Sequence, residues 1–555
     1  MLGIVMSYCE YRAGPFFPYC TSHTPHSAPF AMGRILAVSN RLPVTVSPRD
    51  SNGVDETKLS DKDSLSSSYS YRMSSGGLVS ALSALGGLQW LGWSGIHIPD
   101  SDKPEVREHL ESRYNCTPIF LSEEIADMYY NGFSNSILWP LFHYHPGDMN
   151  FDDEWWEAYT LANRAFARVL AQIWQPGDLI WVHDYHLMLL PAMIREEIQE
   201  QRGSQEVEIA FFLHTPFPTS EIYRVLPVRR EILFGVLQSD LIGFHTYDYV
   251  RHFLSSVTSI LKLETTPVGV HFDRFVNVGV FPIGTDPERF SDGLKRPHVV
   301  ERIKHLRSKF DGIKVFLGVD RLDYIKGLPH KLSAFDIFLT EHPEWIGKCI
   351  LIQVAVPSRQ DVEEYQNLRA VVNELVGRVN GRFGSAEFTP VHFMHRSVDF
   401  DELIALYAIS DVCVVSSTRD GMNLVAYEYI ACQEQQNGQL ILSEFTGAAQ
   451  SLNGALIVNP WNMEEMSNSF NKALTMGTEK KTENTSLLYK YVTKFTTKYW
   501  GSNIVSEMKR IASHRHQKYH VDENESPSVD SGKHLKDTHA MRQATEQALQ
   551  ECKDN

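Results

Sequence analysis

The sequence lacks the features that mark membrane-spanning, secreted and zinc-binding proteins. No apolar run reaches the roughly 18 residues that a membrane span needs, and the apolar stretch 2–6 is too short for a signal-peptide core. The seven cysteines are odd in number, scattered, and never in C-x-x-C spacing. This usage favours a reducing compartment over a disulfide framework or a zinc site. We therefore expect a soluble cytoplasmic protein without a membrane partner.

The chain also lacks a basic surplus. Its 555 residues contain 52 Lys plus Arg against 68 Asp plus Glu, which gives a net charge of −16 at pH 7. Proteins that bind polyanions normally carry an excess of basic residues, so we expect no nucleic-acid partner. A small phosphorylated substrate is not excluded, because a few well-placed cations can hold it.

The interior of the chain alternates short apolar strands with longer amphipathic segments. Strands are predicted at 35–39, 179–183, 209–214, 241–244, 278–283, 315–319, 349–354 and 412–416. Continuous apolar strands separated by helices, such as 77–85 and 401–408, indicate parallel sheets covered on both faces. We therefore predict an α/β fold with two doubly wound domains facing a cleft, over residues 33–295 and 296–480, with the boundary near 292–297. Ligands of such sheets bind at the carboxyl ends of the strands.

Three segments have compositions unlike that of the ordered core. Residues 1–32 are rich in Pro, aromatic residues and His, and we expect a disordered extension there, with Met32 as the hypothetical true start. A Ser- and Asp-rich mobile loop is expected over about 47–70, and a disordered charged tail over 513–555. The irregular spacing of the histidines in that tail favours a solvated segment over a metal site.

The strongest candidate site is the segment GVDRLDYIKG, residues 318–327, in which a predicted strand ends at Val319. Arg321 and Lys326 follow in the turn. A diphosphate leaving group needs its growing negative charge neutralised, and a guanidinium with an ammonium can do this without a metal. The alternative is a pair of surface cations on a loop, which the position at a strand end disfavours.

A second candidate is TRDGMNLVAYE, residues 418–428, where a strand gives way to a helix that begins near Asn423. The unpaired N–H groups at a helix start form a ready anion site. Asp420 and Glu428 are separated by about 12 Å along a helix, which suits one carboxylate on a sugar and the other on a ribose. Alone, an N-cap and a solvated glutamate would explain them. Together with Arg321 and Lys326, they favour a nucleotide-sugar site.

Weaker candidates lie mainly in the N-terminal half. A Gly-Gly pair that opens a helix permits close backbone approach to a ligand, and aromatic side chains can pack on sugar rings or simply fill the core. Asp184, at a strand tip, is interpreted as a hydroxyl-binding or acid–base residue, whereas His214 could equally be a buried, hydrogen-bonded histidine. The candidates of this kind are Arg41, Gly76, Gly77, Trp93, Tyr130, Trp139, Asp184, His214 and Arg359.

Together these motifs resemble the trehalose-6-phosphate synthases of glycosyltransferase family 20, retaining glucosyltransferases that join UDP-glucose to glucose 6-phosphate. The resemblance covers about residues 33–512 and includes SNRLPV, SSGGLVSAL, HDYH, HTPFPTSEIYR, GVDRLDYIKG, VPSR and RDGMNLVAYEY. The sequence of the segment YYNGFSNSILWPLFHYHPG is most similar to that of the fungal members. The resemblance implies two Rossmann-like domains in the GT-B arrangement, and a C-terminal helix over 481–512 that crosses back to the first domain.

The resemblance also implies roles for the candidate residues. Arg321 and Lys326 would grip the UDP diphosphate and would form the catalytic set with Asp184 and His214. The acceptor glucose 6-phosphate would be bound by Arg41, Trp93, Tyr130, Trp139, Asp184 and Arg359. The donor UDP-glucose would be bound by Gly76, Gly77, His214, Arg321, Lys326, Asp420, Met422, Asn423, Leu424 and Glu428.

Retention of the α configuration without an evident carboxylate nucleophile suggests front-face substitution, in which the departing phosphate takes the acceptor's proton. Double displacement through Asp184 is the alternative. No cofactor and no metal is expected, since His183 and His186 could form a metal pair but lack a third ligand. The expected protein partners are further copies of the chain, a trehalose-6-phosphate phosphatase, or both.

Two other functions remain as alternatives. A GT-B transferase with another donor nucleotide or acceptor, such as a glucosylglycerol-phosphate or validoxylamine-type synthase, is disfavoured by Arg41, Tyr130 and Arg359, which suit a phosphorylated acceptor. A non-catalytic regulatory subunit of a trehalose synthase complex would be expected to lose donor cations or acidic residues, and none is missing. A phosphatase on the same chain is not expected, because the sequence has no Asp-x-Asp-Gly-Thr signature.

Overall fold

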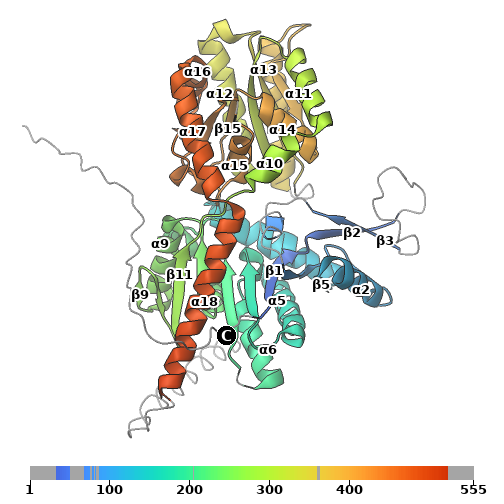
Figure 1. Ribbon diagram of the computed structural model, residues 1–555, viewed down its shortest axis with the longest axis vertical. Helices are drawn as coiled ribbons and strands as arrows, with labels where there is room; N and C mark the ends of the chain where they lie inside the picture. The colour runs from blue at the N-terminus through green and yellow to red at the C-terminus, as the bar shows by residue number, and fades with distance from the viewer. Residues whose placement is uncertain are drawn as a thin grey trace, which may run out of the picture.

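The computed structural model describes residues 33–522, apart from 50–67, 75–77, 80–81, 83–86, 204, 359–362 and 435. The described chain forms two lobes, and a long helix returns from the second lobe to lie along the first (Figure 1). The predicted N-terminal extension, most of the Ser-rich loop and the tail beyond residue 522 lie outside the described residues.

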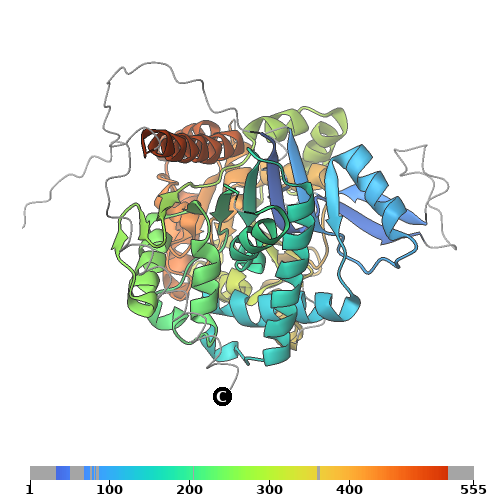
Figure 2. The same ribbon diagram turned by 90° about the horizontal axis from the view of Figure 1, so that it is seen from below.

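The N-terminal domain is built on a nine-stranded sheet. Its strands run parallel except for β10 and β9, which add antiparallel at one edge. In spatial order they are β5 (Cys116–Ile119), β4 (Leu88–Trp93), β1 (Ile35–Arg41), β6 (Leu179–His183), β7 (Glu208–Phe212), β8 (Leu241–Phe244), β11 (Phe275–Val280), β10 (Gly269–His271) and β9 (Thr265–Thr266). A separate hairpin of β2 (Val44–Pro48) and β3 (Tyr69–Met73) projects from this domain (Figures 1 and 2).

The C-terminal domain is built on a six-stranded sheet in which every pair of neighbours is parallel. In spatial order the strands are β14 (Val391–Met394), β13 (Cys349–Val356), β12 (Lys314–Arg321), β15 (Val412–Val415), β16 (Gln439–Ser443) and β17 (Leu456–Val458). Two parallel, doubly wound sheets facing a cleft are the predicted fold class, which is confirmed.

Helices cover both faces of each sheet, as the continuous apolar strands require. In β1, for example, Leu36 and Val38 pack into one core while Ala37 packs into the other. The N-terminal domain contains α2 (Lys103–Tyr114), α3 (Glu123–Asp127), the π-helix η2 (Met128–Leu138), α4 (Trp139–Phe142), α5 (Asp153–Ile173), α6 (Leu190–Arg202), α7 (Ser220–Tyr223), α8 (Arg229–Leu237) and α9 (Tyr247–Ser256). The C-terminal domain contains α10 (Pro287–Leu294), α11 (Pro297–Lys309), α12 (Leu328–Glu341), α13 (Glu363–Phe383), α14 (Phe400–Ile409), α15 (Leu424–Ala431), α16 (Met463–Thr475) and α17 (Thr478–Lys494).

The chain passes between the domains earlier than the predicted boundary near 292–297. Helix α10 already packs within the C-terminal domain, where the ring of Phe290 lies 5.4 Å from that of Phe400. Gly293 also faces α14, the helix of Phe400, since a Cβ there would meet the side chain of Ile404 at 2.6 Å. The crossing therefore falls at about 281–286, and residues 292–297 are instead the end of α10 and the start of α11.

The C-terminal segment predicted as one crossing helix over 481–512 is divided into α17 and α18 (Thr497–Asp522), and α18 continues past the predicted start of the tail. The break falls where the chain crosses back beside its first crossing. There the N–H of Thr497 donates to the carbonyl of Thr285 at 3.0 Å. Gly284 lies so close that a Cβ would meet the carbonyl oxygen of Phe495 at 2.0 Å. The far part of α18 is held because Arg515 pairs with the fully buried Asp240.

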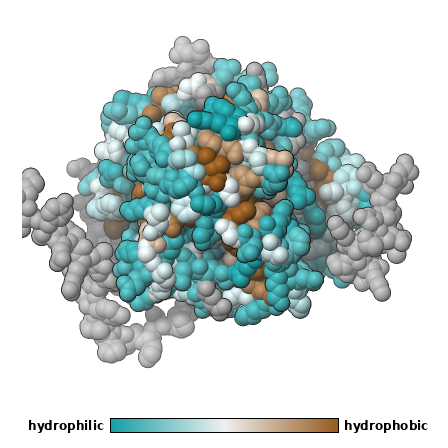
Figure 3. All heavy atoms as spheres, turned by 90° about the horizontal axis from the view of Figure 1, so that it is seen from above, coloured by the Kyte–Doolittle hydropathy of each residue, from teal (hydrophilic) through white to brown (hydrophobic). Residues whose placement is uncertain are grey.

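Within the described ranges, no helix combines the length and the apolar character that crossing a membrane requires. Seen from the end formed by the C-terminal domain, the surface is mostly hydrophilic, with a small apolar group near its centre (Figure 3).

Trp500 of α18 joins the crossing helix to the N-terminal sheet. It is 1% exposed, and its ring lies 5.1 Å from that of Trp181 and 5.2 Å from that of Phe212. We expect Trp500→Ala to lower the free energy of unfolding by about 3–5 kcal/mol, because it empties a packed site. Denaturant titration would measure this change. Trp461→Ala, at a side chain that is 55% exposed, should cost less than about 1 kcal/mol, and equal losses would contradict the assigned role.

Candidate active site

A cavity of about 640 Å³ lies where the carboxyl ends of the two sheets face each other. This is the position predicted for ligands of doubly wound domains. Eight predicted site residues line it, namely Arg41, Trp93, Tyr130, Trp139, Asp184, His214, Arg321 and Asp420. Three other predicted residues, Gly76, Gly77 and Arg359, lie outside the described residues.

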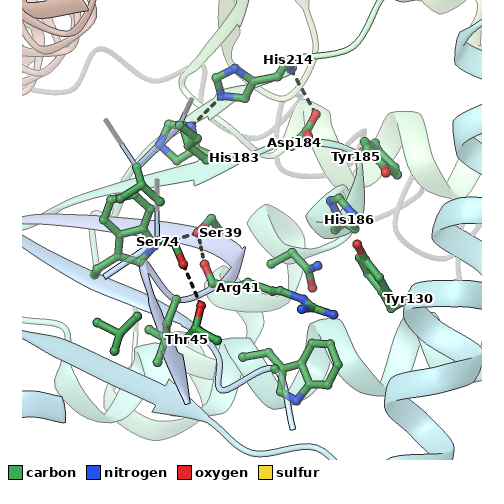
Figure 4. A pocket seen from close by; sticks show the side chains of 18 of the residues that line it. Ser39, Arg41, Thr45, Ser74, Tyr130, His183, Asp184, Tyr185, His186 and His214 are labelled. Atoms are coloured by element: carbon green, nitrogen blue, oxygen red, sulfur yellow. Dashed lines mark hydrogen bonds between the residues drawn. The ribbon is translucent and has the colours of Figure 1, made fainter. Parts of the chain in front are cut away.

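Arg41 ends β1 and projects over aromatic faces on the N-terminal side of the cavity (Figure 4). Its guanidinium carbon lies 4.9 Å from the ring centres of both Trp93 and Tyr130. Tyr130 comes from η2, and its ring stacks on that of His186 at 5.7 Å. Cation–π contacts fix the direction of an arginine without neutralising it, so this exposed cation remains available to an anion.

Asp184 follows β6 with φ 73°, a conformation that residues with a side chain rarely adopt. Its Oδ1 accepts a hydrogen bond from the backbone N–H of His214 at 3.1 Å (Figure 4). Burial raises the pKa of this carboxyl to about 6, against the opposing effect of backbone N–H groups, including those of Tyr185 and Thr215. The carboxyl is therefore held in one orientation and is easily protonated.

Two cations lie at and beyond the end of β12: Arg321 lines the cavity, and Lys326, in the 3-10 turn η6 (Tyr324–Lys326), contacts the lining residue Asp420. The Arg321 guanidinium carbon lies 5.0 Å from the ring centre of Trp139, and a guanidinium nitrogen lies 3.5 Å from the buried carboxylate of Asp323. Lys326 donates from Nζ to Oδ2 of Asp420 at 2.6 Å. The GVDRLDYIKG and RDGMNLVAYEY segments thus meet directly, as their predicted joint role requires.

Asp420 is the centre of a small hydrogen-bond network. Its Oδ2 also accepts from Asn423 at 3.1 Å and from Ser417 at 3.3 Å. Although burial opposes ionisation, Lys326 and the hydrogen bond from Asn423 lower the pKa of Asp420. The carboxylate is therefore charged at neutral pH and has its direction fixed from three sides.

Helix α15 begins at Leu424, immediately after Met422 and Asn423. Asn423 adopts φ 74° and caps the helix, since its side chain accepts from the N–H of Ala426. The first N–H groups of this helix are free of intrahelical partners by construction. The segment is therefore suited to an anion or to the polar edge of a nucleotide.

Glu428 lies further along α15, apart from the residues that line the cavity. Its Oε2 accepts from the hydroxyl of Tyr407 at 3.0 Å. Burial raises the pKa of Glu428 to about 7, against the opposing hydrogen bond from Tyr407. The carboxyl is thus positioned by one phenol.

Several residues of the cavity were not assigned a role from the sequence. His143 is buried, and its Nδ1 lies 2.7 Å from the carbonyl oxygen of Trp139. Because a carbonyl only accepts, this nitrogen carries the proton and Nε2 is left as an acceptor. In the sequence, the only indication of this contact is that His143 follows Trp139 by four residues, which is about one helical turn. The other lining residues without a predicted role include His183, Tyr185, His186, Thr215 and Gly421.

His183 and His186, the pair considered for a metal, both line the cavity. In the part of the chain that the structure describes, no three or more His, Cys, Asp or Glu side chains are arranged to hold a metal ion. His183 instead approaches His214, and His186 packs against Tyr130.

The chain matches known proteins along most of its length. The sequence profile of glycosyltransferase family 20 matches residues 33–510. The "Alpha,alpha-trehalose-phosphate synthase [UDP-forming]" of Yarrowia lipolytica is 63% identical over 483 residues, which cover 86% of this chain and 100% of the relative. The corresponding "56 kDa subunit" of Saccharomyces cerevisiae is 60% identical over 485 residues, which cover 87% and 95%.

Solved structures agree in fold. One described as "Trehalose-6-phosphate from E. coli bound with UDP-2-fluoro glucose" is 31% identical with a TM-score of 0.74, over 86% of this chain and 99% of that chain. A Burkholderia xenovorans synthase in complex with glucose-6-phosphate is 30% identical with a TM-score of 0.74, over 86% and 100%. The N-terminal domain of a Candida albicans trehalose-6-phosphate phosphatase is 31% identical with a TM-score of 0.76, over 86% and 97%.

The raised pKa of Asp184 generates a prediction about stability. The folded protein binds this proton more tightly than the unfolded chain, so the ionised carboxyl destabilises the fold increasingly as pH rises from 3.8 to about 6. Asp184→Asn removes that effect. We expect its advantage in thermal stability over wild type to grow across this window, to at most about 3 kcal/mol, and then to stay constant.

Thermal unfolding at a series of pH values would measure the difference between Asp184→Asn and wild type. Asp292→Asn, at a side chain that is 74% exposed, is the matched control and should show no such trend. A difference between Asp184→Asn and wild type that does not change with pH would contradict the prediction.

Proposed function

Because the chain belongs to glycosyltransferase family 20, we propose that its cleft transfers glucose from UDP-glucose to glucose 6-phosphate with retention of configuration. The products are α,α-trehalose 6-phosphate and UDP. The observation that carries this proposal is that Arg321 and Asp420, the latter paired with Lys326, line one side of a cavity whose other side presents Arg41 and Asp184. Relatives that are 58–63% identical carry the name of this activity.

The donor is proposed to lie on the C-terminal side. Arg321 and Lys326 face its diphosphate, and Asp420 accepts hydroxyls of its glucose. The start of α15, at Met422, Asn423 and Leu424, offers N–H groups to the nucleotide. Glu428 binds the ribose, and Gly76, Gly77 and His214 complete the donor site.

The acceptor is proposed to lie on the N-terminal side. The exposed guanidinium of Arg41 and the predicted cation Arg359 would bind the phosphate of glucose 6-phosphate, because both suit a doubly charged anion. Trp93, Tyr130 and Trp139 supply aromatic faces for the sugar ring. The carboxyl of Asp184 accepts an acceptor hydroxyl.

The proposed chemical step is front-face substitution. The bond between C1 of glucose and the β-phosphate oxygen breaks, the acceptor oxygen bonds to C1 on the same face, and the acceptor's proton passes to the departing phosphate. Arg321 and Lys326 neutralise the growing charge on that phosphate. Three backbone N–H groups hold the carboxyl of Asp184, which supports a binding role for it over attack on C1.

The step is proposed to need no metal, because an arginine and a lysine already stand where a divalent cation would otherwise neutralise the diphosphate. We also propose a cytoplasmic location, which the buried cysteines Cys116, Cys349, Cys413 and Cys432, all without disulfides, favour. The relatives from Kluyveromyces lactis and Saccharomyces cerevisiae are named subunits, and this chain is proposed to assemble likewise, with its own copies or with a trehalose-6-phosphate phosphatase.

A regulatory, non-catalytic role is the second candidate, because the same fold occurs in the N-terminal domain of a phosphatase. The described donor residues argue against it, since Arg321, Lys326 and Asp420 are all present and Lys326 is paired with Asp420. Purified protein given UDP-glucose and glucose 6-phosphate should release UDP and form the α,α-linked product. A folded protein that releases no UDP would favour the regulatory role.

The two cations give a quantitative test. Arg321→Ala and Lys326→Ala should each lower kcat by roughly 10²–10³, because each removes a charge that stabilises the departing diphosphate. Steady-state assays of UDP release would measure this. Lys295→Ala, which removes an exposed cation paired with Asp292, is the control and should turn over like wild type. Undiminished turnover in the two cleft variants would refute the assignment.

Metal removal tests the second part of the proposal. After exhaustive treatment with EDTA, UDP release should stay within about twofold of the untreated rate, because the protein's own cations supply the charge. Adding Mg²⁺ back should not raise it further. Activity that is lost with EDTA and restored by Mg²⁺ would show that a metal ion also binds the diphosphate.

A further inference from the structure

Two histidines from neighbouring strands share one hydrogen bond in the cavity. His183 is the last residue of β6, and His214 follows β7 by two residues. The Nδ1 of His183 lies 3.2 Å from the Nε2 of His214 (Figure 4). The backbone N–H of His214 is held separately by Asp184 at 3.1 Å. His214 is therefore fixed from both sides, and only its Nδ1 remains for a ligand.

His183 is enclosed by aromatic rings. It is 0% exposed, its ring lies 4.8 Å from that of Trp181, and Trp500 of α18 lies 6.3 Å away. Its second ring nitrogen, Nε2, is buried and has no hydrogen-bond partner among the described residues. A polar nitrogen buried in this way needs a physical explanation.

The surroundings select between the two ways of placing the shared proton. Both rings are neutral, since burial lowers the pKa of each well below its ordinary range. If Nδ1 of His183 donated the hydrogen bond, Nε2 of His183 would be an unprotonated acceptor among aromatic rings. If Nε2 of His214 donates instead, Nε2 of His183 carries a hydrogen, which the π electrons of nearby rings attract weakly. The second arrangement has the lower cost.

We infer that His183 is a positioning residue that holds His214 with its proton on Nε2, so that Nδ1 presents an acceptor to a hydroxyl of the donor glucose. This inference rests on the donor-binding role proposed for His214. The inference assigns His214 the role of hydrogen-bond acceptor: its Nδ1 accepts from a sugar hydroxyl and does not donate to one. Trp500 takes part by closing the space around His183.

Substitution of His183 tests the positioning role. His183→Leu should raise KM for UDP-glucose by about tenfold, as for one lost hydrogen bond, with KM for glucose 6-phosphate unchanged. The affinity for UDP alone should also stay unchanged, because UDP lacks the sugar that His214 contacts. His183→Asn should recover most of the affinity for UDP-glucose, because its amide oxygen can accept the hydrogen bond in place of Nδ1.

His245→Leu is the matched control. His245 is buried in the same cluster, with its ring 5.4 Å from that of His214, and it makes no hydrogen bond to that ring. Its substitution should alter thermal stability without the selective loss of UDP-glucose affinity. Equal weakening of UDP and UDP-glucose by His183→Leu, or failure of His183→Asn to restore affinity, would show that His183 is only structural.

The tautomer itself can be read without activity. In protein labelled with 15N-histidine, with signals assigned from His183→Asn and His214→Asn, the Nε2 of His214 should show the shift of a protonated nitrogen and Nδ1 that of an unprotonated one. The reverse pattern would overturn the inference, even in a fully active enzyme. A wild-type protein that released no UDP would instead refute the proposed function, whichever tautomer was found.

Discussion

A close backbone contact limits how the two domains can approach each other. Gly421, in the loop between β15 and α15, lies against the carbonyl of His214, where a Cβ would come within 1.9 Å of the oxygen. Tyr249 of α9 holds the same loop by donating to the carbonyl of Asp420 at 2.9 Å. Any larger residue at 421 would separate the domains. The cavity contains residues of both domains because this contact lets the strand ends meet.

Ion pairs explain how the cleft can hold two of its cations. Lys326 is paired with Asp420, and Arg321 lies near the buried Asp323, so neither cation is isolated in a site of low dielectric. Arg41 differs, because aromatic rings support it and leave its charge exposed. The arrangement separates two kinds of cation. One kind is preorganised by paired carboxylates and the other is open, which suits the proposed departing diphosphate and the proposed acceptor phosphate.

Much of this could be predicted from the sequence, because the informative residues occur at the ends of apolar strands. Strands β6 and β8 have their predicted bounds, and Arg321, Asp184 and His214 lie in the cavity because parallel strands deliver their carboxyl ends to one edge. The early domain crossing and the break before α18 were missed. Both depend on contacts between residues far apart in the chain, such as Thr497 with Thr285, which no local pattern records.

The roles of buried polar residues were hidden for the same reason. In the sequence, His183 is only half of a His-x-x-His pair, yet its partner His214 lies just beyond the end of the next strand, and Trp500 covers it. That cover requires α18 to stay docked, and Arg515 secures it by reaching Asp240, a carboxylate with no exposed surface. Arg515 also pairs with Glu208, so two carboxylates of the N-terminal domain hold the far end of α18 in place. The last described helix thus stabilises the histidine pair at the centre of the cleft.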